Sequence, residues 1–326
     1  MKVIIPVAGK GTRLYPLTHT VPKPLIPVAG KAILGHMLDR LIPLGPRRIT
    51  LVVNPGTQDM IKDYAEQVAP GLVECKVQDV PMGIAHAVMS AGIEAGPVLI
   101  ILGDTIIDAP LVDWIKEGDF MGVKPVDDPR RFGVVELSPD GRITSAVEKP
   151  DEPKSNLALV GLYYLSDGAK LMGAIEKLIG SGTKTKNEYQ ITDALNLMLE
   201  SGWRPYAREI DEWFDCGKIS SLLESNALLL QKYPPGVPSL KGVEIVPPVS
   251  ISSTASVVGG RIGPYVTVME RATITQCELS ECIVGSGASL ENCRMKNSVI
   301  GRNATIKGFV GSLSVGDDSV VKGLQG

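Results

Sequence analysis

Aromatic side chains are scarce in this sequence, in which Phe, Trp and Tyr make up 5% of 326 residues. They are also unevenly distributed, because only Tyr265 and Phe309 stand beyond residue 235. An excess of charge of one sign is absent as well, since 33 Lys and Arg face 36 Asp and Glu, for a formal net charge of −3. Nucleic acids and anionic membranes bind basic faces, so this balance argues against either as the main partner.

Paired cysteines and long apolar runs are missing too. The five cysteines are odd in number and include no Cys-x-x-Cys spacing, which argues against a disulfide framework and a zinc site. The apolar run Val3–Ala8 is interrupted by Pro6 and is too short for the core of a signal peptide. No other run approaches the roughly 18 apolar residues of a membrane span. We therefore expect a soluble protein of the reducing cytoplasm.

The residues that are present suffice for a large core. Hydrophobic types make up 44% of the chain. The 35 Gly and 24 Pro together are 59 of 326 residues, about 18%, below the ~25–30% that indicates low complexity. At roughly 150 residues per domain, the length predicts about two domains.

Short apolar runs alternate with helical patterns over the first 230 residues. The predicted strands are Val3–Val7, Ile49–Val53, Val73–Val77, Val98–Leu102 and Ile143–Val147. Helices are predicted over Ile33–Ile42, with Gly45 as a stop, and over Ile84–Ile93. This order predicts a doubly wound α/β domain over residues 1–235, whose ligands bind beyond the carboxyl ends of the strands.

A different period begins after the Pro-rich stretch 233–238, which we predict as the domain boundary. Apolar residues then recur mostly six residues apart, with three longer gaps of nine or ten: Ile251, Val257, Ile262, Val268, Ile274, Val284, Leu290, Ile300, Ile306, Val315 and Val321. Glycine directly follows four of them: Gly263, Gly285, Gly301 and Gly316. This step predicts a parallel β-helix of about four coils over residues 236–326. A β-sandwich, the alternative, predicts strict alternation and strands roughly 8–12 residues apart.

The flat faces of a β-helix leave no room for rings, which accounts for the missing aromatics. We predict that Cys277, Cys282 and Cys293 are small buried residues of these coils. Unpaired coil ends and flat faces favour self-association. We therefore expect a homo-oligomer and allosteric coupling through the β-helix.

A glycine-rich loop, Ala8–Leu14, directly follows the first strand. Gly9 and Gly11 let the backbone approach a phosphate chain closely. Leu14 stands where a dinucleotide fingerprint needs a third glycine, and the P-loop pattern is absent. Arg13 in the loop and Lys23 between two prolines are cations that suit a triphosphate. A simple tight turn is the structural alternative.

Two aspartates, far apart in the sequence, are candidate metal ligands. Asp104 follows the run Val98–Leu102, and Asp215 lies in a Trp-Phe-Asp-Cys-Gly segment. Taken singly, each is typical of a turn or a helix cap. Together with a phosphate loop, they fit a pair that holds Mg²⁺ between two phosphorylated substrates.

Two further segments carry side chains suited to binding. Gln78 can donate to and accept from a pyrimidine edge, and Gly83 leaves the base room to approach. Glu148 can accept hydrogen bonds from hydroxyl groups, and Lys149 beside it can neutralise an anion such as a phosphate. A plain strand–turn–helix connection and a surface ion pair are the respective alternatives. We assign no chemistry to His86.

The segment 5–14, followed by Pro22-Lys23-Pro24, resembles the signature of the sugar-1-phosphate nucleotidylyltransferases. The resemblance covers the whole chain and is greatest to glucose-1-phosphate thymidylyltransferases and uridylyltransferases with a hexapeptide-repeat tail. The Ile-Pro-Val-Ala-Gly start is similar to uridylyltransferases. Segments 148–150, 153–156 and 161–163 are more similar to thymidylyltransferases.

The resemblance implies a Rossmann-like doubly wound mixed sheet followed by a short left-handed parallel β-helix. It also implies Mg²⁺, a nucleoside triphosphate (dTTP or UTP) and a sugar 1-phosphate, with glucose 1-phosphate favoured. Thr105 stands where thymidylyltransferases usually have Asn, and His86 where relatives often have Gln. A helix start at 187–193 also matches the family, and there Thr192 or Asp193 is expected to cap the helix.

The roles that the resemblance implies can be assigned residue by residue. The catalytic residues are Arg13, Lys23, Asp104 and Lys149; the nucleotide-binding residues are Ala8, Gly9, Gly11, Thr12, Gln78 and Gly83; the sugar-binding residues are Gly133, Glu148, Lys149 and Leu159; the metal ligands are Asp104 and Asp215.

The sequence argues against two other function classes. Acetyl transfer by the β-helix needs a histidine base near the coils, but all three histidines, His19, His36 and His86, lie in the first domain. A catalytically inactive scaffold predicts loss of the charged site residues, all of which are present. Nucleotidyl transfer is therefore the favoured activity, with orientation and charge neutralisation as its means.

Overall fold

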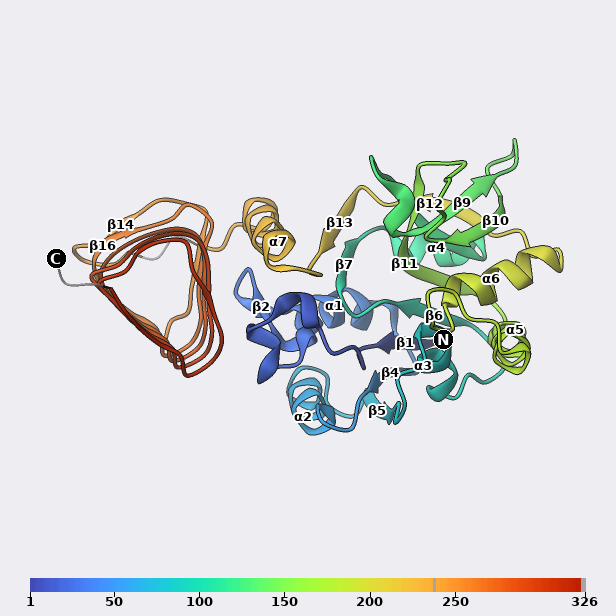
Figure 1. Ribbon diagram of the computed structural model, residues 1–326, viewed down its shortest axis with the longest axis horizontal. Helices are drawn as coiled ribbons and strands as arrows, with labels where there is room; N and C mark the ends of the chain where they lie inside the picture. The colour runs from blue at the N-terminus through green and yellow to red at the C-terminus, as the bar shows by residue number, and fades with distance from the viewer. Residues whose placement is uncertain (237–238, 324–326) are drawn as a thin grey trace. The chain divides into compact units, whose positions relative to one another are not determined.

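The computed structural model describes residues 1–236 and 239–323, which pack into two compact units (Figure 1). The first unit contains residues 1–9 and 37–213, and the second contains residues 10–36 and those from 214 onward. The chain passes between the units three times: after Gly9, within α1 (Ile33–Leu41) and within β13 (Glu212–Asp215). The domain boundary predicted at residue 235 stays a prediction, and Val237 and Pro238 of that stretch lie outside the described residues.

A mixed sheet of nine strands forms the first unit, in the order β10-β9-β11-β6-β1-β4-β5, with β8 paired to β11 and β12 paired to β8. Its strands are β1 (Lys2–Pro6), β4 (Arg48–Val53), β5 (Val73–Val77), β6 (Val98–Ile101), β8 (Phe120–Pro125), β9 (Gly133–Leu137), β10 (Ile143–Glu148), β11 (Leu157–Leu165) and β12 (Tyr206–Glu209). Strands β6, β1, β4 and β5 run parallel, whereas β11 runs antiparallel to β6. The predicted doubly wound mixed sheet is thus confirmed.

Helices and short elements complete this unit: α2 (Gln58–Val68), α3 (Ile84–Ser90), α4 (Leu111–Glu117), α5 (Gly168–Ser181), α6 (Ile191–Glu200), η4 (Ile42–Leu44), η5 (Pro129–Arg131) and β7 (Thr105–Asp108). Helices α3, α5 and α6 share one apolar core with the sheet. Helix α3 ends three residues before the predicted Ile93, because Gly92 adopts φ +66°, a conformation that ends helices. Gly45, the predicted stop after α1, likewise has φ +60°.

The second unit begins with short elements between residues 10 and 36 and continues through one helix. These are η1 (Thr12–Leu14), η2 (Leu17–His19), η3 (Lys23–Leu25), β2 (Pro27–Val28), β3 (Lys31–Ala32) and α7 (Ile219–Lys232). Asn226 of α7 is fully buried. Its Oδ1 accepts from the backbone N–H of Ala29 at 2.9 Å, and its Nδ2 donates to the carbonyl of Tyr265 at 3.0 Å. One side chain thereby joins the N-terminal segment to the C-terminal strands.

Parallel strands wound into a stack form the rest of the second unit, and Figure 1 looks along this β-helix and shows its triangular path. The strands are β14 (Glu244–Ile245), β15 (Val249–Ile251), β16 (Ser256–Ile262), β17 (Val266–Val268), β18 (Thr273–Val284), β19 (Ser289–Glu291), β20 (Arg294–Ile300), β21 (Thr305–Lys307), β22 (Val310–Gly311), β23 (Ser314–Val315) and β24 (Val320–Lys322). The predicted parallel β-helix is confirmed, whereas its left-handed sense stays a prediction.

The strand registers explain the irregular gaps in the sequence repeat. Ten of the predicted inward residues form two columns: Ile251, Val268, Val284, Ile300 and Val315, then Val257, Ile274, Leu290, Ile306 and Val321. The sequence analysis missed most of the third column, in which Leu279 and Met295 follow Ile262 and are each 2% exposed. These residues fill the two gaps of ten. Each complete column has five members, one more than the predicted number of coils.

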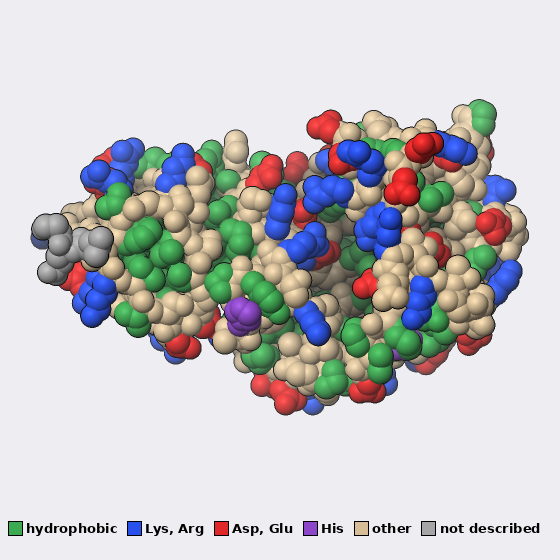
Figure 2. Space-filling view, viewed as in Figure 1, with side chains coloured by type: hydrophobic (Ala, Val, Ile, Leu, Met, Phe, Trp, Pro, Cys, Tyr) green, Lys and Arg blue, Asp and Glu red, His purple; other side chains and the backbone are tan. Residues whose placement is uncertain are grey.

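The expected burial of the coil cysteines is also confirmed. Cys277, Cys282 and Cys293 are 0%, 1% and 3% exposed. Among the described residues, no helix combines the length and apolar character that a membrane crossing requires. Side chains of both charge signs are mixed on the face that Figure 2 presents, as the near-zero net charge leads one to expect.

Corner glycines of the β-helix stand directly over one another. A Cβ added to Gly285 would lie 2.8 Å from the carbonyl carbon of Gly301, and one added to Gly301 would collide with the backbone of Gly316. We expect Gly301→Ala to lower the free energy of unfolding by about 1–3 kcal/mol, the range for overpacking, in urea or thermal unfolding. Gly173→Ala in α5 is the control, because its added Cβ meets nothing within 4 Å. Equal stability of the two variants would contradict the packing argument.

Candidate active site

The predicted site residues fall into clusters, each of which lies within one unit. The turn after β5 holds the first cluster. Gln78 is 5% exposed, and its Nε2 lies 3.2 Å from the carbonyl oxygen of Gly83 and 2.9 Å from Nδ1 of His86. Because a carbonyl only accepts, the amide nitrogen faces Gly83, and His86 accepts the second N–H with its proton on Nε2. The Oε1 of Gln78 therefore points away from both partners.

Gly83 is required by the packing of its own turn. It adopts φ +110°, and an added Cβ would lie 2.7 Å from the backbone nitrogen of Tyr189. The backbone N–H of Tyr189 donates to Met82, and that of Ala85 donates to Tyr189. The strand–turn–helix alternative thus accounts for the glycine, but it does not account for the oriented amide of Gln78.

The second cluster joins three neighbouring strands of the sheet. A Cβ added to Gly133 at the start of β9 would lie 2.9 Å from Cδ1 of Leu159 in β11 and 3.2 Å from Oε2 of Glu148 in β10. Thr192 Oγ1 lies 2.9 Å from the same point and donates to Glu148 Oε2 at 2.7 Å. Lys149 Nζ lies 3.1 Å from Glu148 Oε1. The structure therefore brings all four predicted sugar-binding residues together.

Thr192 has a contact that the sequence alone did not indicate, and Asp193 lies beside it. Neither caps α6, whose N-cap is Gln190 and which has no side-chain capping bond. Thr192 is 3% exposed and donates to Glu148 instead. Burial raises the pKa of Asp193, and the charge of Glu148 adds to the increase. The only sequence signal was their match to the family's helix start.

Lys149 has a strained backbone. Its φ is +44°, in the left-handed region that favours glycine, and its N–H donates to Phe132 at 2.9 Å. Such a conformation at a non-glycine residue costs of order 1–3 kcal/mol and often marks a functional site. The strain favours a binding role for Lys149 over the surface ion pair that was the alternative.

The carboxyl edge of the sheet holds the third cluster. Strands β1 and β6 are parallel neighbours, and a Cβ added to Gly103 would lie 2.8 Å from the carbonyl oxygen of Pro6. Ala8 and Gly9 follow β1 there, while the half-buried Asp104 follows β6 and accepts from Thr105 Oγ1 at 3.3 Å. A Cβ added to Gly9 meets nothing within 4 Å, so packing within the chain does not require this glycine.

The phosphate loop continues in the second unit. Gly11 has φ +64°, and an added Cβ would lie 3.1 Å from Cγ2 of Thr18 and 3.2 Å from Cβ of Lys23. The hydroxyl of Thr18 donates to the carbonyl of Gly11 at 2.8 Å. Thr12 and Arg13 are exposed in η1. Lys23 is thus packed against the loop that carries Gly11, and Thr18 is a loop-supporting residue that no motif had indicated.

Arg13 and Asp215 come together beside Gly217. Oδ1 of Asp215 accepts from the N–H of Gly217 at 2.7 Å. A Cβ added to Gly217 would lie 2.7 Å from that same Oδ1 and 3.2 Å from a guanidinium nitrogen of Arg13. A larger residue at position 217 would therefore push the two charged groups apart, which explains why glycine follows Cys216 here.

The carboxylates fit a magnesium site by chemistry. Asp104 and Asp215 are half-buried oxygen donors, the ligand type that Mg²⁺ prefers. Within residues 1–236 and 239–323, no three His, Cys, Asp or Glu side chains form a metal-binding group. Mg²⁺ is often held by one or two carboxylates plus substrate phosphates, so two protein ligands suffice. Each unit holds one of the two, and their pairing stays a prediction.

The family of this chain follows from comparison with known proteins. Residues 2–232 match the family model described as Nucleotidyl transferase. The chain belongs to this family. The match confirms the resemblance that the glycine-rich loop had suggested and makes the protein a nucleotidyltransferase.

Three relatives show which kinds of nucleotidyltransferase this chain is similar to. The chain is 34% identical to the low-salt glycan biosynthesis nucleotidyltransferase Agl11 of Haloferax volcanii, over 71% of this chain and 66% of that protein. It is 30% identical to glucose-1-phosphate thymidylyltransferase of Streptomyces griseus, over 94% and 93%. It is 33% identical to UTP–glucose-1-phosphate uridylyltransferase AglF of H. volcanii, over 65% and 89%. The Streptomyces match extends into the β-helix.

Solved structures agree with this assignment. A protein described as a glucose-1-phosphate thymidylyltransferase from Bacillus anthracis, in complex with a sucrose, superimposes with a TM-score of 0.62 at 29% identity, covering 70% of this chain and 94% of that one. A UDP-glucose pyrophosphorylase complexed with UDP-glucose gives a TM-score of 0.60 at 24% identity, which shows the fold alone.

The burial of His86 predicts a pH dependence of stability. Burial lowers the pKa of His86 from its ordinary 6.5, so the unfolded chain binds this proton at a higher pH than the folded chain does. Stability therefore falls as the pH falls through 6.5 towards the lowered pKa. We expect His86→Gln to flatten this slope in urea unfolding between pH 7.5 and 5. His19→Gln, which removes an exposed histidine, should keep it. An unchanged slope in His86→Gln would refute the assignment.

Proposed function

We propose that this nucleotidyltransferase transfers a nucleotidyl group from dTTP or UTP to glucose 1-phosphate, giving a nucleotide sugar and pyrophosphate. The observation that carries the proposal is the convergence of Glu148, Leu159 and Thr192 on one point beside Gly133, with Lys149 adjoining Glu148. The relatives named as glucose-1-phosphate thymidylyl- and uridylyltransferases support the choice of substrates.

The reaction needs no protein nucleophile, because the sugar phosphate is already an anion. One of its oxygens attacks the α-phosphorus of the triphosphate, and pyrophosphate leaves in line. The protein therefore contributes orientation and charge neutralisation. Arg13 and Lys23 hold the triphosphate, and Lys149 holds the sugar phosphate. Asp104 and Asp215 would hold Mg²⁺, which stabilises the charge that develops on the phosphates.

Glu148 is suited to bind the sugar although both of its oxygens already have partners. Each carboxylate oxygen has two lone pairs, and here Oε2 accepts from Thr192 while Oε1 faces Lys149. One lone pair on each oxygen is left for sugar hydroxyls. The two contacts also hold the carboxylate in one orientation, so little side-chain entropy is lost when the sugar binds.

The orientation of Gln78 supports a base with an N–H donor on its pairing edge. Since its Nε2 faces Gly83 and His86, its Oε1 is the atom presented to a ligand. Uracil and thymine both offer N3–H to such an acceptor, whereas cytosine offers a lone pair there. The two favoured bases differ by one methyl group, worth only ~1 kcal/mol.

A homo-oligomer in the reducing cytoplasm is part of the same proposal. All five cysteines are free thiols. The β-helix exposes the apolar side chains of Val258, Val310 and Val320, which favour assembly.

A substrate matrix tests the function. We expect pyrophosphate release with glucose 1-phosphate to be fastest with dTTP or UTP and at least about tenfold slower with CTP, because CTP leaves the Gln78 acceptor unpaired. GTP and the 1-phosphates of mannose, galactose and glucosamine complete the matrix. Asp104→Asn is the inactive control. No release with any pair would refute the proposal and favour a catalytically inactive homologue.

Lys149 provides a test of the sugar-phosphate site. We expect Lys149→Gly to raise the KM for the sugar phosphate by about tenfold or more, the loss of roughly one charge-assisted contact, with the triphosphate KM within about twofold. Because glycine relieves the strained φ, the variant should be no less stable. Lys154→Ala, at an exposed lysine 3.9 Å from Glu136, is the control. Equal increases in both KM values would contradict the assignment.

A further inference from the structure

The turn that follows the phosphate loop contacts the last coil of the β-helix, and both belong to the second unit. Pro16, His19 and Thr20 line one side of a cavity of about 250 Å³. Residues of 314–319 line the other side. A Cβ added to Gly316 would lie 3.0 Å from the carbonyl oxygen of Pro16, so the close approach of the two segments depends on glycine.

Asp317 bridges the two segments. Its side chain is only 4% exposed. Arg302 on the preceding coil holds it, with the backbone N–H 2.7 Å from Oδ1 and Nε 2.7 Å from Oδ2. The same Oδ2 accepts from the hydroxyl of Thr20 at 2.9 Å. A carboxylate anchored within the β-helix therefore holds one residue of the N-terminal turn.

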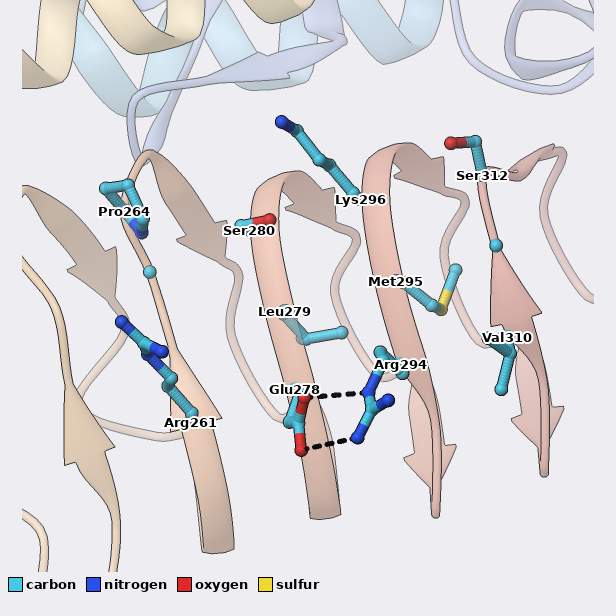
Figure 3. A pocket seen from close by; sticks show the side chains of 12 residues that line it. Arg261, Pro264, Glu278, Leu279, Ser280, Arg294, Met295, Lys296, Val310 and Ser312 are labelled. Carbon is cyan, nitrogen blue, oxygen red and sulfur yellow. Dashed lines mark hydrogen bonds and ion pairs between the residues drawn. The ribbon is translucent and has the colours of Figure 1, made fainter.

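A second pair of the β-helix has the same chemistry on an exposed face. Arg294 donates to Glu278 on the preceding coil at 2.8 and 3.0 Å, as Figure 3 shows. These side chains are 69% and 54% exposed. Exposed pairs of this kind contribute little to stability. The Arg302–Asp317 pair differs in its burial and in its additional bond to Thr20.

Another residue of the same turn contacts the phosphate loop. Thr18 lies two residues before Thr20 in η2, and its hydroxyl donates to the carbonyl of Gly11 at 2.8 Å. The rings of Tyr15 and His19 stack at 4.0 Å across the turn. This short turn, which the stacked rings stabilise, thus contacts the phosphate loop through Thr18 and the β-helix through Thr20.

We propose that the last coil of the β-helix positions the phosphate loop for the triphosphate, with Asp317 and Thr20 as the positioning residues. The inference rests on the proposed function in naming the triphosphate as the ligand. Ordering an exposed glycine-rich loop costs conformational entropy. A loop that is already held by the β-helix loses less of that entropy on binding, and its affinity is higher for this reason. The β-helix thereby serves the active site of its own chain.

Two variants test this positioning. Thr20→Val removes the hydroxyl at nearly constant volume, and Asp317→Asn removes the charge. For both we expect the triphosphate KM to rise about three- to tenfold with the sugar-phosphate KM within twofold, and hydrogen exchange of residues 10–20 to become faster. Thr20→Ser should restore wild-type values. Glu278→Gln, the matched change on the exposed pair, should alter neither readout.

The outcomes separate this inference from the proposed function. Unchanged exchange of residues 10–20 in Thr20→Val and Asp317→Asn would overturn it, as would equal increases in both KM values. Should the wild-type protein lack transfer activity, hydrogen exchange of the unliganded chain still decides the inference, because it needs no substrate. Faster exchange in both variants, with Glu278→Gln unchanged, would then support loop positioning although the proposed function had failed.

Discussion

Parallel pairing of β1 with its neighbours determines where chemistry can take place in the first unit. The carboxyl ends of parallel strands lie at one edge, so Ala8 and Gly9 after β1 reach the same edge as Asp104 after β6. The backbone at Gly103 lies so close to β1 that no Cβ fits between them. The parallel pairing of β1 with β6 therefore sets where Asp104 and the open surroundings of Gly9 lie.

Antiparallel strands added to that parallel core supply the cluster that we propose to bind the sugar. Strand β11 pairs with both β9 and β6, so Gly133, Glu148 and Leu159 are brought together although the sequence separates them. The start of α6 then contributes Thr192, whose hydroxyl donates to Glu148. The mixed character of the sheet is therefore what brings Gly133, Glu148 and Leu159 next to the parallel strands of the first unit.

The β-helix combines a uniform interior with specific contacts at its surface. Its interior consists of aliphatic side chains, Met295 and three cysteines that act as small apolar residues. Its surface carries ion pairs between coils, of which Arg302–Asp317 is distinguished by burial and by a bond to Thr20. The β-helix, whose interior is uniform, thus holds the irregular segment 10–36 in place through a few polar side chains.

The sequence by itself determined the features that repeat or are local. Apolar runs predicted β1, β4, β5 and β6 to within a residue or two, and a six-residue step predicted the β-helix, because each pattern is set by backbone geometry within a few residues. The loop motif indicated the family through its resemblance, and the match over residues 2–232 confirmed it.

Only the tertiary structure decided how distant side chains combine. Thr192 and Glu148 are 44 residues apart, and Thr20 and Asp317 are 297 apart, so no local pattern marks either bond. The same holds for the missed inward residues Leu279 and Met295, whose place is set by register with the coil before. Local periodicity indicates which face of a strand a residue occupies. The side chain that it contacts on that face depends on the register with which a distant segment pairs.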